Sequence, residues 1–130
     1  MHRSNAILNP RLLAAVAGLG HGQSLFIVDP GFPIPDGPEL IDLSLHAGTP
    51  SFADVLTTIV AELSVESSVA AGETEEHSPP AYAAMIGAGL APRIVAHDEL
   101  KLMAANARTI VRTGDVVPFS NIALIGGVTF

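Results

Sequence analysis

The sequence contains no cysteine and only six lysine or arginine residues among its 130 residues. Without cysteine there can be no disulfide, no thiolate catalysis and no cysteine-ligated zinc site, and the composition is compatible with a reducing cytosol. Thirteen carboxylates set the formal net charge at −7, whereas nucleic-acid binding depends on clustered cations. We therefore expect a cytoplasmic protein that does not bind nucleic acid.

Charge of either sign is scarce. Charged residues make up 15% of the chain, hydrophobic residues make up 48%, and the mean hydropathy is +0.45. Soluble globular chains usually carry roughly 25% charged residues, so a monomer would have too little charge to cover its surface. The composition predicts a homo-oligomer that hides apolar surface between subunits. The length predicts a single domain over residues 1–130.

Several catalytic and binding motifs are also missing. The chain has no GxGxxG or GxxxxGK[ST] loop, no HExxH pair and no GxSxG elbow, which argues against nucleotide cofactors and serine hydrolysis. Five scattered histidines lack the spacing of a metal site. No apolar run approaches the roughly 20 residues of a membrane span. Arg3 and the apolar residues 12–19 imitate a signal peptide, but Asn9-Pro10 is typical of a helix start, and we reject a cleaved leader. We expect no cofactor, no metal and no membrane.

Turn residues and hydrophobic spacing predict four helices and six strands that alternate along most of the chain. The expected helices cover residues 10–18, 52–63, 79–87 and 99–107, with Asn9, Ser51, Ser78 and Asp98 at their starts. The expected strands cover residues 24–29, 39–45, 65–70, 93–96, 109–112 and 121–125, and residues 127–130 resemble a further buried strand. Residues 72–78 are expected to form a loop. This rhythm predicts an α/β fold, a three-layer α/β/α arrangement with a mixed β-sheet.

Three polar residues lie where ligands bind in such folds, at strand ends or in open turns. Asp29 ends the apolar run 25–28, and His97 directly follows the strand expected at 93–96. Histidine titrates near pH 6.5 and can exchange protons at neutral pH. His21 lies in the glycine-rich turn 18–22, where little side-chain bulk hinders a ligand. The structural alternatives are a turn-capping aspartate, an ordinary helix-start histidine and a polar turn residue.

Other polar residues have weaker or ordinary interpretations. The Asn121 amide can both donate to and accept from a hydroxyl, which suits a sugar, although turn-forming asparagine is the commoner case. The acidic run at residues 73–76 is interpreted as a solvated surface loop. His46 and His77 are likewise placed in solvated loops.

Short segments spread along the chain resemble one known family. They are Leu19-Gly20-His21, residues 29–35 (DPGFPIP), 48–52 (GTPSF), 118–122 (PFSNI) and 127–130 (GVTF). In order and spacing they resemble the D-ribose pyranase and L-fucose mutarotase (RbsD/FucU) family, and they are closer to the pyranase branch. The resemblance extends from about residue 7 to the end of the sequence.

The resemblance implies a cofactor-free isomerase that interconverts pyranose and furanose forms of an aldose, with D-ribose as the expected monosaccharide. It also implies a decamer of stacked rings with sites near subunit contacts. It assigns the catalytic role to His21, and it assigns substrate binding to Asp29, His97, Phe119, Ser120 and Asn121. The family motif carries a tyrosine where this chain has Phe119, so a phenolic hydroxyl is absent here.

Ring opening of a hemiacetal requires removal of the anomeric hydroxyl proton and protonation of the ring oxygen. One or two groups that titrate near neutral pH can do this. We expect His21 to move the proton while Asp29, His97 and Asn121 hold hydroxyls. One alternative is a mutarotase for L-fucose or another aldose. A second is a non-catalytic sugar-binding or regulatory protein on the same scaffold, which the replacement of the family tyrosine by Phe119 keeps open. A third is a structural oligomer without a ligand.

Overall fold

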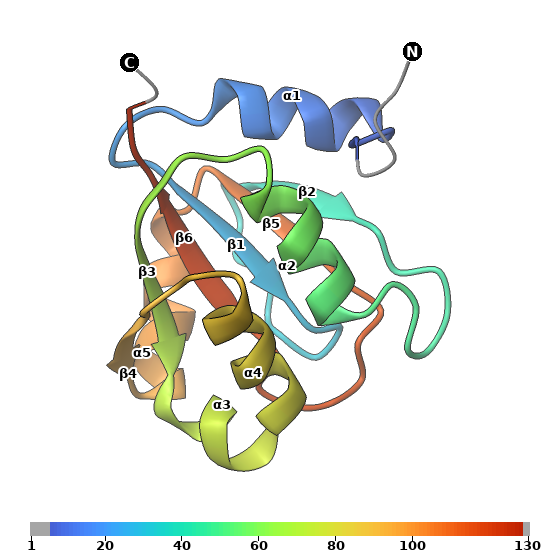
Figure 1. The fold of residues 1–130 in the computed structure, drawn as a ribbon, viewed down its shortest axis with the longest axis vertical. Helices are drawn as coiled ribbons and strands as arrows, with labels where there is room; N and C mark the ends of the chain where they lie inside the picture. The colour runs from blue at the N-terminus through green and yellow to red at the C-terminus, as the bar shows by residue number, and fades with distance from the viewer. Residues whose placement is uncertain (1–5, 129–130) are drawn as a thin grey trace.

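A mixed six-stranded sheet forms the centre of the computed structural model, which describes residues 6–128 (Figure 1). The strands are β1 (Ser24–Val28), β2 (Glu39–Asp42), β3 (Val65–Ala71), β4 (Arg93–Val95), β5 (Thr109–Arg112) and β6 (Ile122–Gly126). Their order across the sheet is β2-β5-β1-β6-β3-β4. Strand β6 runs antiparallel to both of its neighbours, and the other pairs are parallel. The predicted mixed sheet is confirmed.

Helices cover both faces of the sheet and complete three layers. They are α1 (Pro10–Gly18), α2 (Phe52–Val60), α3 (Gly72–His77), α4 (Pro79–Gly87) and α5 (His97–Met103), which a 3-10 turn at Ala104–Asn106 extends. Apolar residues of α1, α2 and α4 form one core with Leu25 and Ile27, whereas those of α5 pack with Phe26 and Val28 on the opposite face. All four of these β1 side chains are almost completely buried. Strand β1 is therefore buried on both faces of the sheet, as its continuous apolar run predicts.

Two of the predicted helix starts are confirmed in atomic detail. The Asn9 side chain accepts a hydrogen bond from the Leu12 N–H at 3.0 Å, and Pro10 is the first helical residue. The Ser51 hydroxyl accepts from the Asp54 N–H at 3.1 Å at the start of α2. Such caps satisfy amide groups that the first turn of a helix leaves without partners.

Several of the expected elements differ from the structure. Residues 72–77, expected in a loop, form α3, because carboxylates in a first turn interact favourably with the helix dipole and the buried Thr74 anchors the turn. Asp98 does not cap the next helix, since α5 begins at His97, two residues earlier than expected, and Asp98 pairs with Lys101 within it. Strand β2 ends at Asp42 instead of residue 45. Residues 127–128 are not in a strand, and residues 129–130 lie outside the described range.

One edge of the sheet collects the ends of four strands that are distant in sequence. Strands β1, β4 and β5 end at this edge, and antiparallel β6 begins there, with Ile122 opposite Ile27. Asp29, His97 and Asn121 therefore come to the same edge, as expected for a ligand site in an α/β sheet. Over residues 6–128, no helix is long and apolar enough to cross a membrane.

Candidate functional site

A cavity of about 330 Å³ opens at this sheet edge. Its walls come from the loop after β1, the start of α5 and the loop between β5 and β6. The lining residues are Asp29, Pro30, Gly31, Phe32, His97, Asp115, Val116, Pro118 and Phe119. The fold thus brings three of the predicted site residues, Asp29, His97 and Phe119, from three segments into one cavity. The mixture of apolar rings and three ionisable groups suits a small molecule that has both C–H faces and hydroxyl groups.

Asp29 supplies the carboxylate of the cavity. Burial raises the pKa of this carboxyl, while backbone amides of Gly31, Ser120 and Phe32 and the Asn121 side chain act in the opposite direction and lower it. The Asp29 backbone N–H donates to Oδ1 of Asn121 at 2.8 Å. A carboxylate that is surrounded by fixed amide groups can accept hydrogen bonds from ligand hydroxyls without reorganising its surroundings.

His97 is held between two aromatic rings. Its ring meets Phe32 edge-on at a centroid distance of 5.9 Å and Phe119 edge-on at 4.9 Å. The buried Nδ1 atom has no hydrogen-bond partner within residues 6–128. Because buried polar atoms are rarely left without partners, such an atom indicates a position where a ligand group or a water belongs. His97 therefore offers one ring nitrogen in a fixed orientation.

Ser120 and Asn121 lie behind the cavity wall instead of lining it, and both are completely buried. The Ser120 hydroxyl pairs with the Ser78 hydroxyl at 2.8 Å and also lies 2.9 Å from the Val117 carbonyl. Nδ2 of Asn121 has no hydrogen bond of regular geometry in the described part of the chain. The Asn121 side chain thus supports the Asp29 backbone, and the Ser120 side chain is bonded to other parts of the protein.

His21 lies at the opposite end of β1. It borders a different hollow of about 460 Å³, formed mainly by α1 and the segments around residues 62–64 and 127–128. Its Nε2 is 2.9 Å from Oε1 of Glu66, and the side chains of both residues are about half exposed. The five residues of β1 separate His21 from Asp29, a strand length of roughly 16 Å at about 3.3 Å per residue. A single chain therefore does not bring His21 to the other predicted residues.

Three contributors to the site were not predicted from the sequence. The Glu73 carboxylate, expected to be solvated, accepts the His97 backbone N–H at 3.2 and 3.3 Å. Asp115 accepts from the Phe52 N–H at 2.9 Å and the Val117 N–H at 3.1 Å, which ties α2 to the cavity wall. Phe32 flanks His97. Asp115 and Phe32 each follow a predicted strand closely, and this position was an available signal, whereas nothing in the sequence links Glu73 to His97.

The acidic and histidine side chains do not suggest a metal centre. Within the described residues, no three His, Cys, Asp or Glu side chains are grouped closely enough to hold an ion. Asp29 and His97 present polar groups that can form hydrogen bonds at this edge of the sheet.

Comparison with known proteins gives concordant results. Residues 2–129 match the RbsD / FucU transport protein family. The chain is 48% identical over 124 residues to a D-ribose pyranase of Streptomyces avermitilis, covering 95% of this chain and 96% of the relative. It is 41% identical over 133 residues to a D-ribose pyranase of Pseudomonas syringae pv. syringae, covering 98% and 99%.

Solved structures agree with the fold. RbsD of Bacillus subtilis, in a structure complexed with D-ribose, superposes with a TM-score of 0.92 at 34% identity and covers 100% of both chains. The fucose mutarotase of Streptococcus pneumoniae, in complex with L-fucose, has a TM-score of 0.79 at 19% identity, over 98% of this chain and 96% of that one. The second likeness speaks for the fold alone.

Proposed function

Because the chain belongs to the RbsD / FucU transport protein family, we propose that it is a D-ribose pyranase, an isomerase that interconverts the pyranose and furanose forms of D-ribose. Relatives at 41% and 48% identity over nearly the whole chain carry that name, and the superposed Bacillus subtilis protein is complexed with D-ribose. The observation in this chain that carries the proposal is the cavity that Asp29 and the His97 ring line together with apolar rings, where the buried Nδ1 of His97 has no hydrogen-bond partner among residues 6–128.

The cavity matches the chemistry of a free sugar. The Asp29 carboxylate accepts hydrogen bonds from hydroxyls, and Nδ1 of His97 exchanges a hydrogen bond with another hydroxyl. Phe119 and Phe32 present apolar surface to the C–H groups of the sugar and keep water away from the ring. Ser120 and Asn121 hold Phe119 and Asp29 from behind. Ring opening breaks the bond between the anomeric carbon and the ring oxygen, and closure forms a bond from that carbon to a different hydroxyl oxygen. Proton transfers assist both steps and no electrons are gained or lost overall, so the reaction needs no cofactor.

The position of His21 leads to a site shared between copies of the chain. As the proposed proton shuttle, His21 must reach the sugar that Asp29 holds, yet β1 separates the two residues by roughly 16 Å within one chain. A monosaccharide is too small to span this length of strand. We therefore assign His21 of one subunit to the cavity of another subunit, which makes self-association a condition of activity.

Composition supports the same assembly, since exposed Leu45, Leu102 and Leu8 add apolar surface to a chain that is poor in charge. The family resemblance implies ten subunits, and the absence of cysteine suits the cytoplasm. Sedimentation equilibrium counts the subunits, and a monomer at micromolar concentration would contradict the shared site.

Saturation-transfer NMR on equilibrated D-ribose tests the activity, because it measures exchange between pyranose and furanose anomeric signals. The wild-type protein should accelerate exchange, and His21→Ala should abolish the acceleration. Acceleration with L-fucose but not D-ribose would indicate a mutarotase instead. Binding of ribose without faster exchange would indicate a sugar-binding protein, with Phe119→Tyr as the next variant.

Complementation tests the shared site. His21→Ala and Asp29→Asn should each be inactive alone. If the two variants assemble at random into mixed oligomers, about one quarter of the sites combine an intact His21 from one copy with an intact Asp29 from another. Recovery of activity on mixing supports the shared site. Mixed oligomers with no activity would place both residues of a working site in a single chain.

A further inference from the structure

Phe119, in the cavity wall, has an unusual backbone. Its φ angle is 66°, and it is the only residue other than glycine with positive φ among residues 6–128. In this left-handed region the Cβ of an L-amino acid comes too close to a neighbouring carbonyl oxygen. A bulky residue stays in that conformation only when its surroundings hold it there. Phe119 therefore needs contacts that hold its backbone in this conformation.

Thr74, on α3, provides the direct contact. Its Oγ1 donates to the Phe119 carbonyl oxygen at 2.7 Å, and Thr74 is completely buried. The next residue is held from the same region, since the Ser120 hydroxyl pairs with the Ser78 hydroxyl at the junction of α3 and α4. Two hydroxyl contacts thus fix the turn that carries Phe119 to one short helix and the residue after it.

The backbone angle of Phe119 decides where its ring lies. In the observed conformation the ring packs edge-on against His97 at 4.9 Å and lies 5.3 Å from the His77 ring. If Phe119 relaxed to negative φ, its ring would leave this position and His97 would lose one of its two aromatic neighbours. The cavity would then lose both a wall and the fixed orientation of its histidine.

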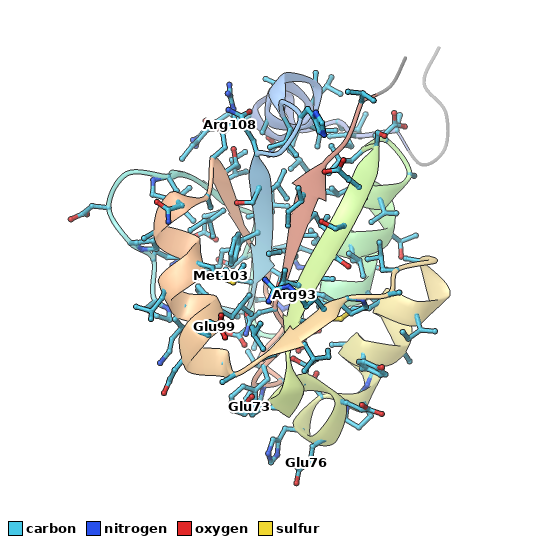
Figure 2. All side chains as sticks on the ribbon, turned by 90° about the vertical axis from the view of Figure 1, so that its left-hand side faces the viewer. Glu73, Glu76, Arg93, Glu99, Met103 and Arg108 are labelled. Atoms are coloured by element: carbon cyan, nitrogen blue, oxygen red, sulfur yellow. The ribbon has the colours of Figure 1, made fainter. Side chains whose placement is uncertain are left out.

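Helix α3 also contacts the cavity wall that the start of α5 forms. Glu73, one residue before Thr74, accepts the His97 backbone N–H with its carboxylate. Figure 2 shows Glu73 on this helix close to the start of α5, and Glu76 at its outer end pointing away from the protein. Adjacent residues of α3 thus contact the two segments whose aromatic rings meet in the cavity.

We propose that Thr74 is a positioning residue of the sugar site: its hydroxyl keeps Phe119 in the left-handed conformation and so keeps the Phe119 and His97 rings in place. This inference rests on the proposed function, in that the sugar occupies the cavity beside Phe119. Thr74 touches no substrate and acts through Phe119.

Thr74→Val tests the proposal, because valine keeps the branched shape and removes only the donor. The Phe119 carbonyl then loses its Thr74 partner, and the KM for D-ribose exchange should rise about 5- to 30-fold. The kcat should stay within about twofold, because the variant weakens binding of the ground state and the transition state equally and leaves the proton shuttle intact. Thr74→Ser keeps the hydroxyl and should behave as wild type. Thr58→Val is the matched control, since Thr58 makes the same type of bond, to the Asp54 carbonyl at 2.7 Å, on an exposed helix face.

The Phe119→Gly background separates positioning from general stability. Glycine adopts the left-handed region without strain, so Thr74→Val should change KM little further there. An equal rise in KM in both backgrounds would overturn the proposal. Should Thr74→Val not fold, Thr74→Cys replaces it, because a thiol is a weak donor. Its KM must then exceed that of Thr74→Ser, and equal values would also overturn the proposal.

NMR of the aromatic rings keeps the two hypotheses apart. If the wild-type protein accelerates no ribose exchange, the proposed function fails. The role of Thr74 is then judged from the Phe119 and His97 ring signals of the sugar-free protein. Thr74→Val must shift both sets of signals while Thr74→Ser leaves them in place, and unshifted signals in the valine variant would refute the positioning role.

Discussion

Replacing Asn121 by leucine should lower the stability of the protein by a calculable amount. Asn121 is completely buried, and its Oδ1 is the acceptor for the Asp29 backbone N–H at 2.8 Å. Leucine has a similar branched shape but no acceptor. The Asp29 N–H would then stay buried without a hydrogen bond, directly after the central strand β1.

A buried amide that loses its partner costs about 1–3 kcal/mol. The same substitution removes Nδ2 of Asn121, which has no regular partner in the described part of the chain, and this partly offsets the loss. We therefore expect a decrease of about 1–2 kcal/mol in the free energy of unfolding. For a chain of this length, each kcal/mol corresponds to about 3–5 °C in Tm. The predicted fall in Tm is thus about 3–10 °C.

Thermal unfolding followed by circular dichroism measures this difference. Both proteins must be compared at equal chain concentration and without ribose, because association and ligand binding both raise Tm. Asn106→Leu is the control, since Asn106 is exposed and does not line the cavity, and it should leave Tm within about 1 °C. A Tm for Asn121→Leu equal to that of wild type would refute the reasoning that the Asn121–Asp29 bond supports the site.

Two further predictions concern Asp29 and Gly114. Because burial raises the pKa of Asp29, its contribution to stability is fully present below its ordinary value of 3.8 and is lost as pH rises through the raised pKa. Urea unfolding should therefore show Asp29→Asn gaining stability relative to wild type between pH 3.5 and pH 7. Asp42→Asn should show the opposite sign, because hydrogen bonds from Arg112 and Ser44 lower the pKa of Asp42; the same sign in both variants would contradict this account. A Cβ on Gly114 would collide with the backbone of Thr49 and come within 2.8 Å of the His46 carbonyl, so Gly114→Ala should lose about 3 kcal/mol of unfolding free energy. Gly87→Ala, where a Cβ meets no atom within 4 Å, is its control, and equal stability of the two alanine variants would count against a tight contact at Gly114.

Local sequence signals determined most of the secondary structure. Two helix starts are specified locally, because the side chains of Asn9 and Ser51 each accept a hydrogen bond from the backbone N–H three residues later. Pro10 adds to the first of these signals. The unbroken apolar run of β1 specifies a strand that is buried on both sides. These elements were predictable because the signals that specify them come from residues that are close together in the sequence.

Helix α3 and the start of α5 were not predictable in this way. A glycine followed by three carboxylates and a threonine resembles a solvated loop when it is read alone. Its helical form depends on Thr74 bonding to Phe119, 45 residues away, and on Glu73 bonding to His97, 24 residues away. The Glu73 carboxylate accepts a hydrogen bond from the His97 N–H, the first amide of α5. Glu73 thus has the capping role that the sequence suggested for Asp98.

In the candidate site, too, some features follow from local sequence and others only from the tertiary structure. The sequence by itself determined the family, the fold class and the identity of Asp29, His97 and Phe119, because strand ends and short motifs are local features. Only the tertiary structure decided that Asn121 lies behind Asp29, and that His21 faces a different hollow at the far end of β1. Strand direction and register fix these distances, and both are set by pairing between segments that are far apart in the chain.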